Sequence, residues 1–237
     1  MSPHVVHIGD VIGHGILFDP RNAAFLPTMD FNDLLASIPR LFDLLDERGV
    51  DYVLVGGIAM RVHAPGRNTQ DIALIVPAEA FDRVPEIRVI DRNASFARAK
   101  FGRLQIDFLL SDHSSDSLGG HTLFEIVRSQ HARRERFVER EIVCATVEGL
   151  LLLKLFALPS LNRRGKFSRV EDYEHDIAVL LREHRPDMGP IYTELASHLS
   201  ESDLIEVRSV VAGIEQRIVE SQGRFGGRGS GADAEDR

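Results

Sequence analysis

The sequence contains a single cysteine, Cys144, in 237 residues. One cysteine excludes an intrachain disulfide framework, which favours a reducing compartment. Cys144 stands in the short apolar run 142–145, where a free cysteine behaves as a small hydrophobic residue. We therefore expect Cys144 to be a buried packing residue.

The chain also lacks an excess of positive charge and any long apolar run. Its formal net charge is −8, whereas proteins that grip duplex DNA non-specifically are usually basic, because Lys and Arg replace condensed counterions. The sequence has no run of about 18 apolar residues, so no membrane span is expected. It also has no N-terminal basic segment followed by an apolar one, so no secretory signal is expected. These absences predict a cytoplasmic protein with no membrane partner.

The composition that remains is typical of a globular protein, with 43% hydrophobic and 27% charged residues. Residues 1–30 form an N-terminal extension. Its short apolar runs at 4–8 and 16–18 are separated by glycine-rich turn residues. This pattern predicts an irregular or hairpin-forming segment.

Residues 31–145 combine strand and helix patterns. Apolar residues recur at three- and four-residue steps from 30 to 48, which predicts a helix that ends at Gly49. Pro39 is expected to kink this helix or to begin a second one. Further on, strands are expected at 52–55, 72–76, 87–90, 94–100, 104–110 and 142–145, with helices at 58–63 and 123–129.

The chain becomes helical from Thr146, which is placed to cap a helix over 147–158 with Glu148 near the positive end of its dipole. The predicted fold is therefore mixed α/β (α+β), a small mixed-sheet core followed by helices. The expected parts are the extension 1–30, the core 31–145, a helical subdomain 146–221 with helices at 170–184, 190–199 and 202–220, and a polar, disordered tail 222–237.

Gly56 and Gly57 separate the first predicted strand of the core from the helix that follows. Two glycines at such a junction permit a tight turn and let a phosphate group approach backbone N–H groups at a helix N-terminus. A plain packing turn has the same sequence signature, so the pair alone leaves both interpretations open.

Two aspartates lie in strands that are otherwise apolar. Asp71 opens the strand 71–76, where alternation places it on one face with Ala73, and Asp107 lies inside the strand 104–110. A buried carboxylate is costly unless it is paired or bound to a metal ion. Carboxylates on neighbouring strands suit Mg²⁺ or Mn²⁺, and charge neutralisation is what phosphoryl and nucleotidyl transfer need most. The alternative to a metal-binding role is that Asp71 is simply an exposed residue at the end of a strand.

These stretches together resemble the polymerase-β type nucleotidyltransferase superfamily. The likeness rests on Gly56-Gly57-Ile58-Ala59, on Arg67-x-Thr69-x-Asp71-Ile72-Ala73 and on Ile106-Asp107, and it extends over about residues 31–185. Within the superfamily, the sequence is most similar to the abortive-infection type nucleotidyltransferase toxins of bacterial toxin–antitoxin systems.

The resemblance implies a role for each matching residue. Gly56, Gly57 and Thr69 would bind the nucleotide, and Asp71 and Asp107 would hold the metal ion. Arg67 and Lys154 would neutralise the charge of the triphosphate. Asp176 would act as an acid–base group or orient the lysine.

Two of these residues also have structural interpretations. Lys154 interrupts an apolar helix, and its structural alternative is a lysine that extends to the helix edge. Asp172 and Asp176 lie about one helical turn apart, as on a solvated helix face.

Two segments of the chain are basic. The segment 131–140 is expected to be a solvated face. The segment 162–169 is expected to be a flexible loop, with RNA contact as its functional alternative.

Ala73 is the main departure from the family pattern, because the family has its second metal-binding aspartate there. This loss has two explanations, an engineered Asp→Ala change or a natural variant that turns over poorly. The sequence thus predicts a Mg²⁺-dependent enzyme that transfers NMP from an NTP to an acceptor, with a tRNA 3′ end or a protein side chain as acceptor and an antitoxin as partner. The alternatives are a catalytically silent binding or regulatory protein and a small-molecule (antibiotic) nucleotidyltransferase.

Overall fold

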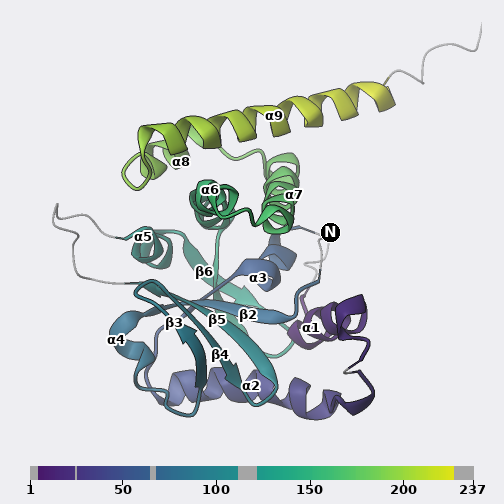
Figure 1. Cartoon of the computed structure of the whole chain (residues 1–237), viewed down its shortest axis with the longest axis vertical. Coiled ribbons are helices and arrows are strands. Elements are labelled where there is room, and N and C mark those ends of the chain that lie inside the picture. The colour runs from purple at the N-terminus through teal and green to yellow at the C-terminus, as the bar shows by residue number, and fades with distance from the viewer. Residues whose placement is uncertain (1–4, 25, 65–67, 112–121, 227–237) are drawn as a thin grey trace, which may run out of the picture. The chain divides into compact units, whose positions relative to one another are not determined.

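The computed structural model describes residues 5–24, 26–64, 68–111 and 122–226 (Figure 1). The chain divides into two compact units, Met1–Leu153 and Lys154–Arg237, and the boundary falls inside one helix. Each unit is described by itself below.

The first unit is built on a mixed sheet. In the described residues its strand order is β3-β4-β5-β2-β1-β7-β6, with β2 parallel to β5, β1 parallel to β7, and the other neighbours antiparallel. The strands are β1 (Val53–Val55), β2 (Asp71–Pro77), β3 (Arg88–Arg92), β4 (Phe96–Phe101), β5 (Leu104–Ser111), β6 (Ala132–Arg136) and β7 (Glu141–Ala145). This architecture confirms the predicted α/β class.

Helices cover both faces of this sheet. Figure 1 shows α2 beneath the sheet and α3 and α5 above it. The helices of this unit are α1 (Ile8–Leu17), α2 (Phe31–Glu47), α3 (Gly56–His63), α4 (Ala78–Phe81) and α5 (Leu123–Gln130), with short 3₁₀ turns η1 (Pro20–Asn22) and η2 (Leu26–Thr28). On the α4 side, the ring of Phe81 packs edge-on against that of Phe108 with centroids 4.9 Å apart.

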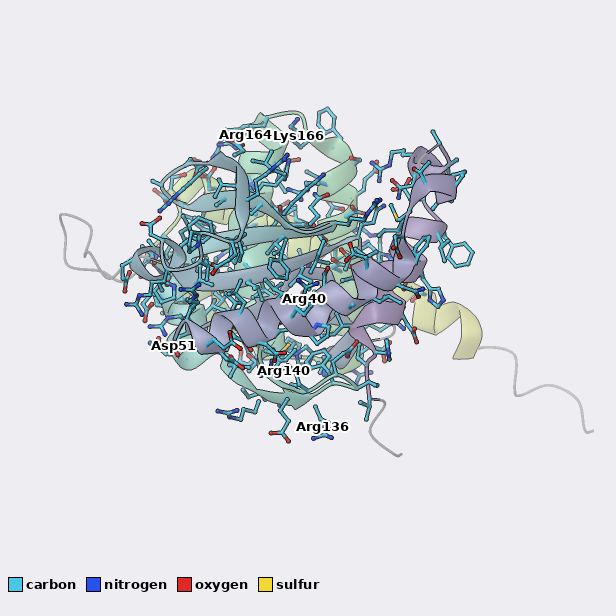
Figure 2. All side chains as sticks on the ribbon, turned by 90° about the horizontal axis from the view of Figure 1, so that it is seen from below. Arg40, Asp51, Arg136, Arg140, Arg164 and Lys166 are labelled. Carbon is cyan, nitrogen blue, oxygen red and sulfur yellow. The ribbon has the colours of Figure 1, made fainter. Side chains whose placement is uncertain are left out.

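The predicted helix over 30–48 is confirmed as α2. Asp30 caps its N-terminus by accepting from the Asp33 amide at 3.0 Å, and Gly49 follows its end with φ of +61°. Pro39 lies inside this one helix, so it does not begin a second helix. Arg140, which precedes β7 and is labelled in Figure 2, donates to Asp43 of α2 at 2.8 Å.

The N-terminal extension is helical, so the predicted irregular segment or hairpin is wrong. Ile8, Val11, Ile12 and Ile16 have helical spacing and are buried in α1. The carboxylate of Glu139 accepts from the amides of Ile8 and Gly9 at 3.1 and 2.9 Å and so stabilises the helix N-terminus. The glycines predicted to form turns lie inside this helix, because tertiary packing outweighs their low helix propensity.

Gly15 packs closely against Thr69, which lies just before β2. A Cβ atom there would collide with the backbone carbonyl oxygen of Thr69, whereas one at Gly13 would meet nothing within 4 Å. We expect Gly15→Ala to destabilise the protein by about 1–3 kcal/mol, as overpacking does. Gly13→Ala should stabilise it by about 0.5–1 kcal/mol through helix propensity alone. Urea denaturation of both variants is the measurement, and equal midpoints would show that α1 does not pack on Thr69.

Strand β6 was not predicted. The segment 131–140 was expected to be a solvated face because of its many charges. Arg133 and Arg134 are indeed exposed, but their backbone pairs with β7 at the edge of the sheet, Arg133 opposite Cys144 and Arg134 opposite Val143. Charged side chains are common on edge strands, where they hinder pairing with other chains.

Cys144 is fully buried in β7, as expected, and burial raises the pKa of its thiol far above its usual value. The thiolate is the reactive form, so the native protein should not react with a thiol reagent such as dithionitrobenzoate at pH 8. In denaturant, one equivalent should react per chain because the sequence has one cysteine. Rapid labelling under native conditions would mean that β7 opens readily.

The second unit consists of helices. Helix α6 (Val147–Arg163) enters it from the first unit, with Thr146 accepting from the Gly149 amide at 3.3 Å as the predicted cap. The others are α7 (Phe167–His184), α8 (Met188–Leu195) and α9 (Glu201–Gly226). Helix α9 reaches into the predicted tail 222–237, of which 227–237 lie outside the described residues. No helix in the described ranges is long and apolar enough to cross a membrane.

Candidate nucleotide-binding site

The pairing of β2 with β5 brings the two strand aspartates onto one face of the sheet. Ala73 is the direct partner of Asp107, and Asp71 is the partner of Gln105. Directly paired residues in adjacent strands point to the same side, and residues two apart in a strand do so as well. Asp71, Ala73 and Asp107 therefore form one surface, as the alternation in the sequence predicts.

Helix α3 begins beside this surface, because Val55 at the end of β1 pairs with Ala73. Gly56 has φ of +69°, and a Cβ there would lie 2.8 Å from the Ala73 Cβ. A Cβ on Gly57 would lie 2.7 Å from the Thr69 Cβ. Close packing thus explains both glycines. It also brings the helix N-terminus, which has no side-chain cap, next to the carboxylate surface.

Thr69 is mostly buried and donates its hydroxyl hydrogen bond to the carboxylate of Asp71. Together with its packing against Gly57 and Gly15, this contact gives Thr69 a positioning role for Asp71. Arg67, the other predicted nucleotide ligand of this stretch, lies outside the described residues.

Arg98 is a member of this surface that was not predicted from the sequence. It is the β4 partner of Asp107, and its Nε donates to Asp107 Oδ1 at 3.3 Å. The Asp107 side chain is 7% exposed and that of Arg98 is 41% exposed. The pairing of β4 with β5 is needed to see this contact, because Arg98 in isolation looks like an ordinary strand residue that alternates with buried alanines.

The surface fits the expected magnesium or manganese ions poorly. Asp71 and Asp107 supply two carboxylates, the third position is the methyl group of Ala73, and Asp107 already accepts from a guanidinium. Within the described ranges, no group of three or more carboxylate, histidine or cysteine side chains could hold a metal ion. The residues present therefore do not fit the site implied by the family pattern.

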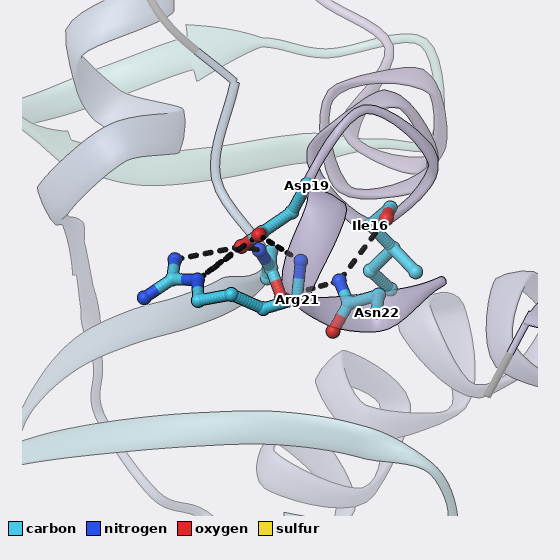
Figure 3. Close-up of polar contacts among 5 residues, drawn as sticks. Ile16, Asp19, Arg21 and Asn22 are labelled. Carbon is cyan, nitrogen blue, oxygen red and sulfur yellow. Dashed lines mark hydrogen bonds and ion pairs between the residues drawn. The ribbon is translucent and has the colours of Figure 1, made fainter. Parts of the chain in front are cut away.

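The N-terminal segment is tied to the residue just before Asp71. Gln70 donates to Asp19 and accepts from Asn22 at 3.0 Å. Asn22 also donates to the Ile16 carbonyl at 3.0 Å (Figure 3). Hydrogen bonds from Arg21 hold the pKa of Asp19 well below its usual range, so Asp19 is charged at neutral pH. The extension thus fixes the start of β2.

Lys154 and Asp176 meet in the second unit. Lys154 Nζ donates to Asp176 Oδ2 at 2.7 Å, with the two side chains 6% and 4% exposed. The ammonium also lies 4.6 Å from the centroid of the Tyr173 ring. The lysine is therefore a buried, paired residue rather than one that extends to the helix edge, and Asp176 orients it. The predicted contact of Lys154 with triphosphate stays a prediction.

The basic segment 162–169 covers the end of α6, the connection 164–166 and the start of α7, so most of the predicted loop is helical. Its Arg163 pairs with Asp203 of α9, and Asn162 donates to Glu206 at 2.6 Å. Arg164 and Lys166 are exposed (Figure 2). The segment is thus anchored at its start, and its contact with RNA stays a prediction.

No protein-family model matches this sequence, and no curated protein matches it. The structure is similar to the crystal structure of an antigenic nucleotidyltransferase-like protein from Paracoccidioides brasiliensis, with a TM-score of 0.51 and 13% identity over 81% of this chain and 91% of that one.

Weaker similarity is found to the antibiotic-resistance factor ANT(2'')-Ia. Its solution structure has a TM-score of 0.48 at 14% identity, over 83% of this chain and 98% of that one. Its crystal structure in complex with adenylyl-2''-tobramycin has a TM-score of 0.45 at 14% identity, over 74% and 93%. The strand order, the mixed sheet and the Paracoccidioides structure together show that this chain has a nucleotidyltransferase fold.

Proposed function

We propose that the first unit binds a nucleoside triphosphate, with its phosphates at the N-terminus of α3. The observation that carries this proposal is the uncapped start of α3 at Gly56 and Gly57, packed against the strand that presents Asp71 and Ala73. Unpaired N–H groups and the helix dipole favour an anion at such a position. The nucleotidyltransferase fold supports the same site.

The reaction class is transfer of NMP from the NTP to an acceptor. An acceptor oxygen would attack the α-phosphorus, the bond to pyrophosphate would break, and the acceptor proton would pass to a base. Asp71 and Asp107 are the carboxylates of this surface, and Thr69 positions Asp71. Arg67, Lys154 and Asp176 keep the phosphate-neutralising and lysine-orienting roles that the resemblance implies.

The acceptor and biological setting are proposed chiefly from the resemblance. A tRNA 3′ end or a protein side chain is the first candidate for the acceptor, in the cytoplasm and as the toxin of a toxin–antitoxin pair. A small molecule such as an aminoglycoside is the next. The exposed cations Arg164 and Lys166, between α6 and α7, favour a nucleic-acid acceptor because they can contact phosphates.

A second candidate function is a catalytically silent protein that binds nucleotide. Two observations favour it: the methyl group at Ala73 in place of a carboxylate, and the pairing of Asp107 with Arg98. Neither removes the helix N-terminus proposed to bind the phosphates, but both would weaken proton transfer and metal binding.

The experiment has two parts. Calorimetry with ATP, GTP, CTP and UTP tests binding, and incubation of the protein with each radiolabelled NTP, Mg²⁺ and total tRNA tests transfer. Binding of one NTP with label in tRNA supports the enzyme, and binding without label supports the silent protein. Absence of binding for all four nucleotides would refute the proposed function.

A further inference from the structure

Four residues form a continuous row across the centre of the sheet. Arg98 of β4 pairs with Asp107 of β5, Asp107 pairs with Ala73 of β2, and Ala73 pairs with Val55 of β1. Gly56 and helix α3 follow Val55 directly. The row thus has a guanidinium at one end, the start of a helix at the other, and the small Ala73 side chain between them.

The spacing of this row suits a phosphate group above Ala73. Neighbouring strands lie about 4.8 Å apart, so the backbones of Arg98 and Ala73 are separated by roughly 10 Å. Arg98 bridges the first half of that distance, because its Nε reaches Asp107 at 3.3 Å. In the described part of the chain, its two terminal nitrogens donate no hydrogen bond, and the guanidinium carbon lies 5.9 Å from the centroid of the Phe96 ring. An anion above Ala73 would therefore lie between the guanidinium and the start of α3.

The charges of the row also favour a phosphate group at this position. A third carboxylate at position 73 would add negative charge and require a cation before a triphosphate could approach. Ala73 removes that charge, and Arg98 offsets the charge of Asp107. A guanidinium also binds phosphate oxygens with paired donors in a fixed geometry, which a lysine does not provide.

We propose that this site binds its nucleoside triphosphate without a divalent metal ion, with Arg98 in the position of the metal. Nε of Arg98 holds Asp107, and the terminal nitrogens donate to phosphate oxygens above Ala73. This inference rests on the proposed nucleotide binding and deepens it, because it names the group that replaces the ion implied by the family pattern.

The first test uses the unchanged full-length protein. The tightest-binding of the four nucleotides is titrated by calorimetry in buffer with excess EDTA and again with Mg²⁺. We expect the two dissociation constants to agree within about twofold, because no carboxylate set is present in the described residues to bind the ion. Titration with Mn²⁺ alone should give no binding heat. Nucleotide binding only with Mg²⁺ would overturn the inference but leave the proposed function standing, whereas binding in neither buffer would refute the proposed function itself.

The second test changes the guanidinium. Arg98→Met should weaken nucleotide binding in EDTA by about 10- to 100-fold, as expected when charge-assisted hydrogen bonds are lost. Arg98→Lys keeps the charge but loses the paired donors. Its affinity for nucleotide should lie between that of the unchanged protein and that of Arg98→Met. The matched control is Arg134→Met, since Arg134 is an exposed arginine of β6 at the opposite edge of the sheet.

Circular dichroism and thermal melting establish that each variant is folded before titration. The control should bind as tightly as the unchanged protein, within about twofold, because surface charges far from the site have small effects. Folded Arg98→Met protein with unchanged affinity in EDTA would overturn the inference, as would an equal loss in the Arg134→Met control.

Discussion

Replacing Ala73 by aspartate should strongly increase Mg²⁺-dependent transfer of NMP, or create it if the unchanged protein is the silent form. The new carboxylate would lie between Asp71 and Asp107 on the same strand face and complete a set of three metal ligands. A metal ion stabilises the transition state of such reactions by several kcal/mol. Because each 1.36 kcal/mol changes a rate tenfold, we expect an increase of roughly 100-fold or more in the label transferred to acceptor.

The matched control for this change is Ala73→Asn, which has the same size without the charge. Both side chains have room to project from the sheet, because Ala73 is partly exposed and faces the bare backbone of Gly56. Only Ala73→Asp should gain Mn²⁺ binding and labelling activity, and its expression should arrest cell growth if the protein belongs to a toxin–antitoxin pair. Equal activity of the two variants, or none in a folded Ala73→Asp protein that binds NTP, would contradict the role of position 73.

Removal of the Lys154 charge should strongly destabilise the protein. Lys154→Met would leave the Asp176 carboxyl group buried and without the donor that now lies 2.7 Å away. Breaking one side of a buried pair typically costs about 3–5 kcal/mol. Chemical denaturation measures the loss. Arg182→Met removes an arginine of α7 from an exposed ion pair and should change the free energy of unfolding by less than about 0.5 kcal/mol.

The double variant Lys154→Met with Asp176→Leu separates the structural from the functional role of the pair. Replacing both members by apolar residues should restore most of the lost stability, because no charge is left buried. If Lys154 also contacts triphosphate, this stable double variant should bind NTP more weakly than the unchanged protein. Unchanged affinity would restrict the pair to a structural role, and a double variant no more stable than Lys154→Met would contradict the pairing argument.

Local sequence patterns were sufficient for much of the fold. The periodic apolar residues of α2, the alternating residues of β2 and β5, and the threonine cap of α6 are all present as predicted. These signals are local, since they arise from the 3.6-residue helix repeat and the two-residue strand repeat. The same alternation places Asp71 and Ala73 on one face without any knowledge of the strand pairing.

Three features depended on contacts between distant segments. Helix α1 forms around several glycines because it packs on Thr69 and is capped by Glu139. Strand β6 carries exposed charges but pairs with β7, and Arg98 reaches Asp107 only because β4 lies beside β5. In each case long-range packing or pairing outweighs the local propensity.

The sequence by itself therefore determined the fold class, the glycine turn and the missing carboxylate at Ala73, because each is encoded by residues close together in the chain. Only the tertiary structure decided which groups surround Ala73. Strand pairing brings Arg98 to one side of it and the start of α3 to the other, across a register that no local pattern specifies. That register is why an arginine, rather than a metal ion, is the group proposed to meet the phosphates.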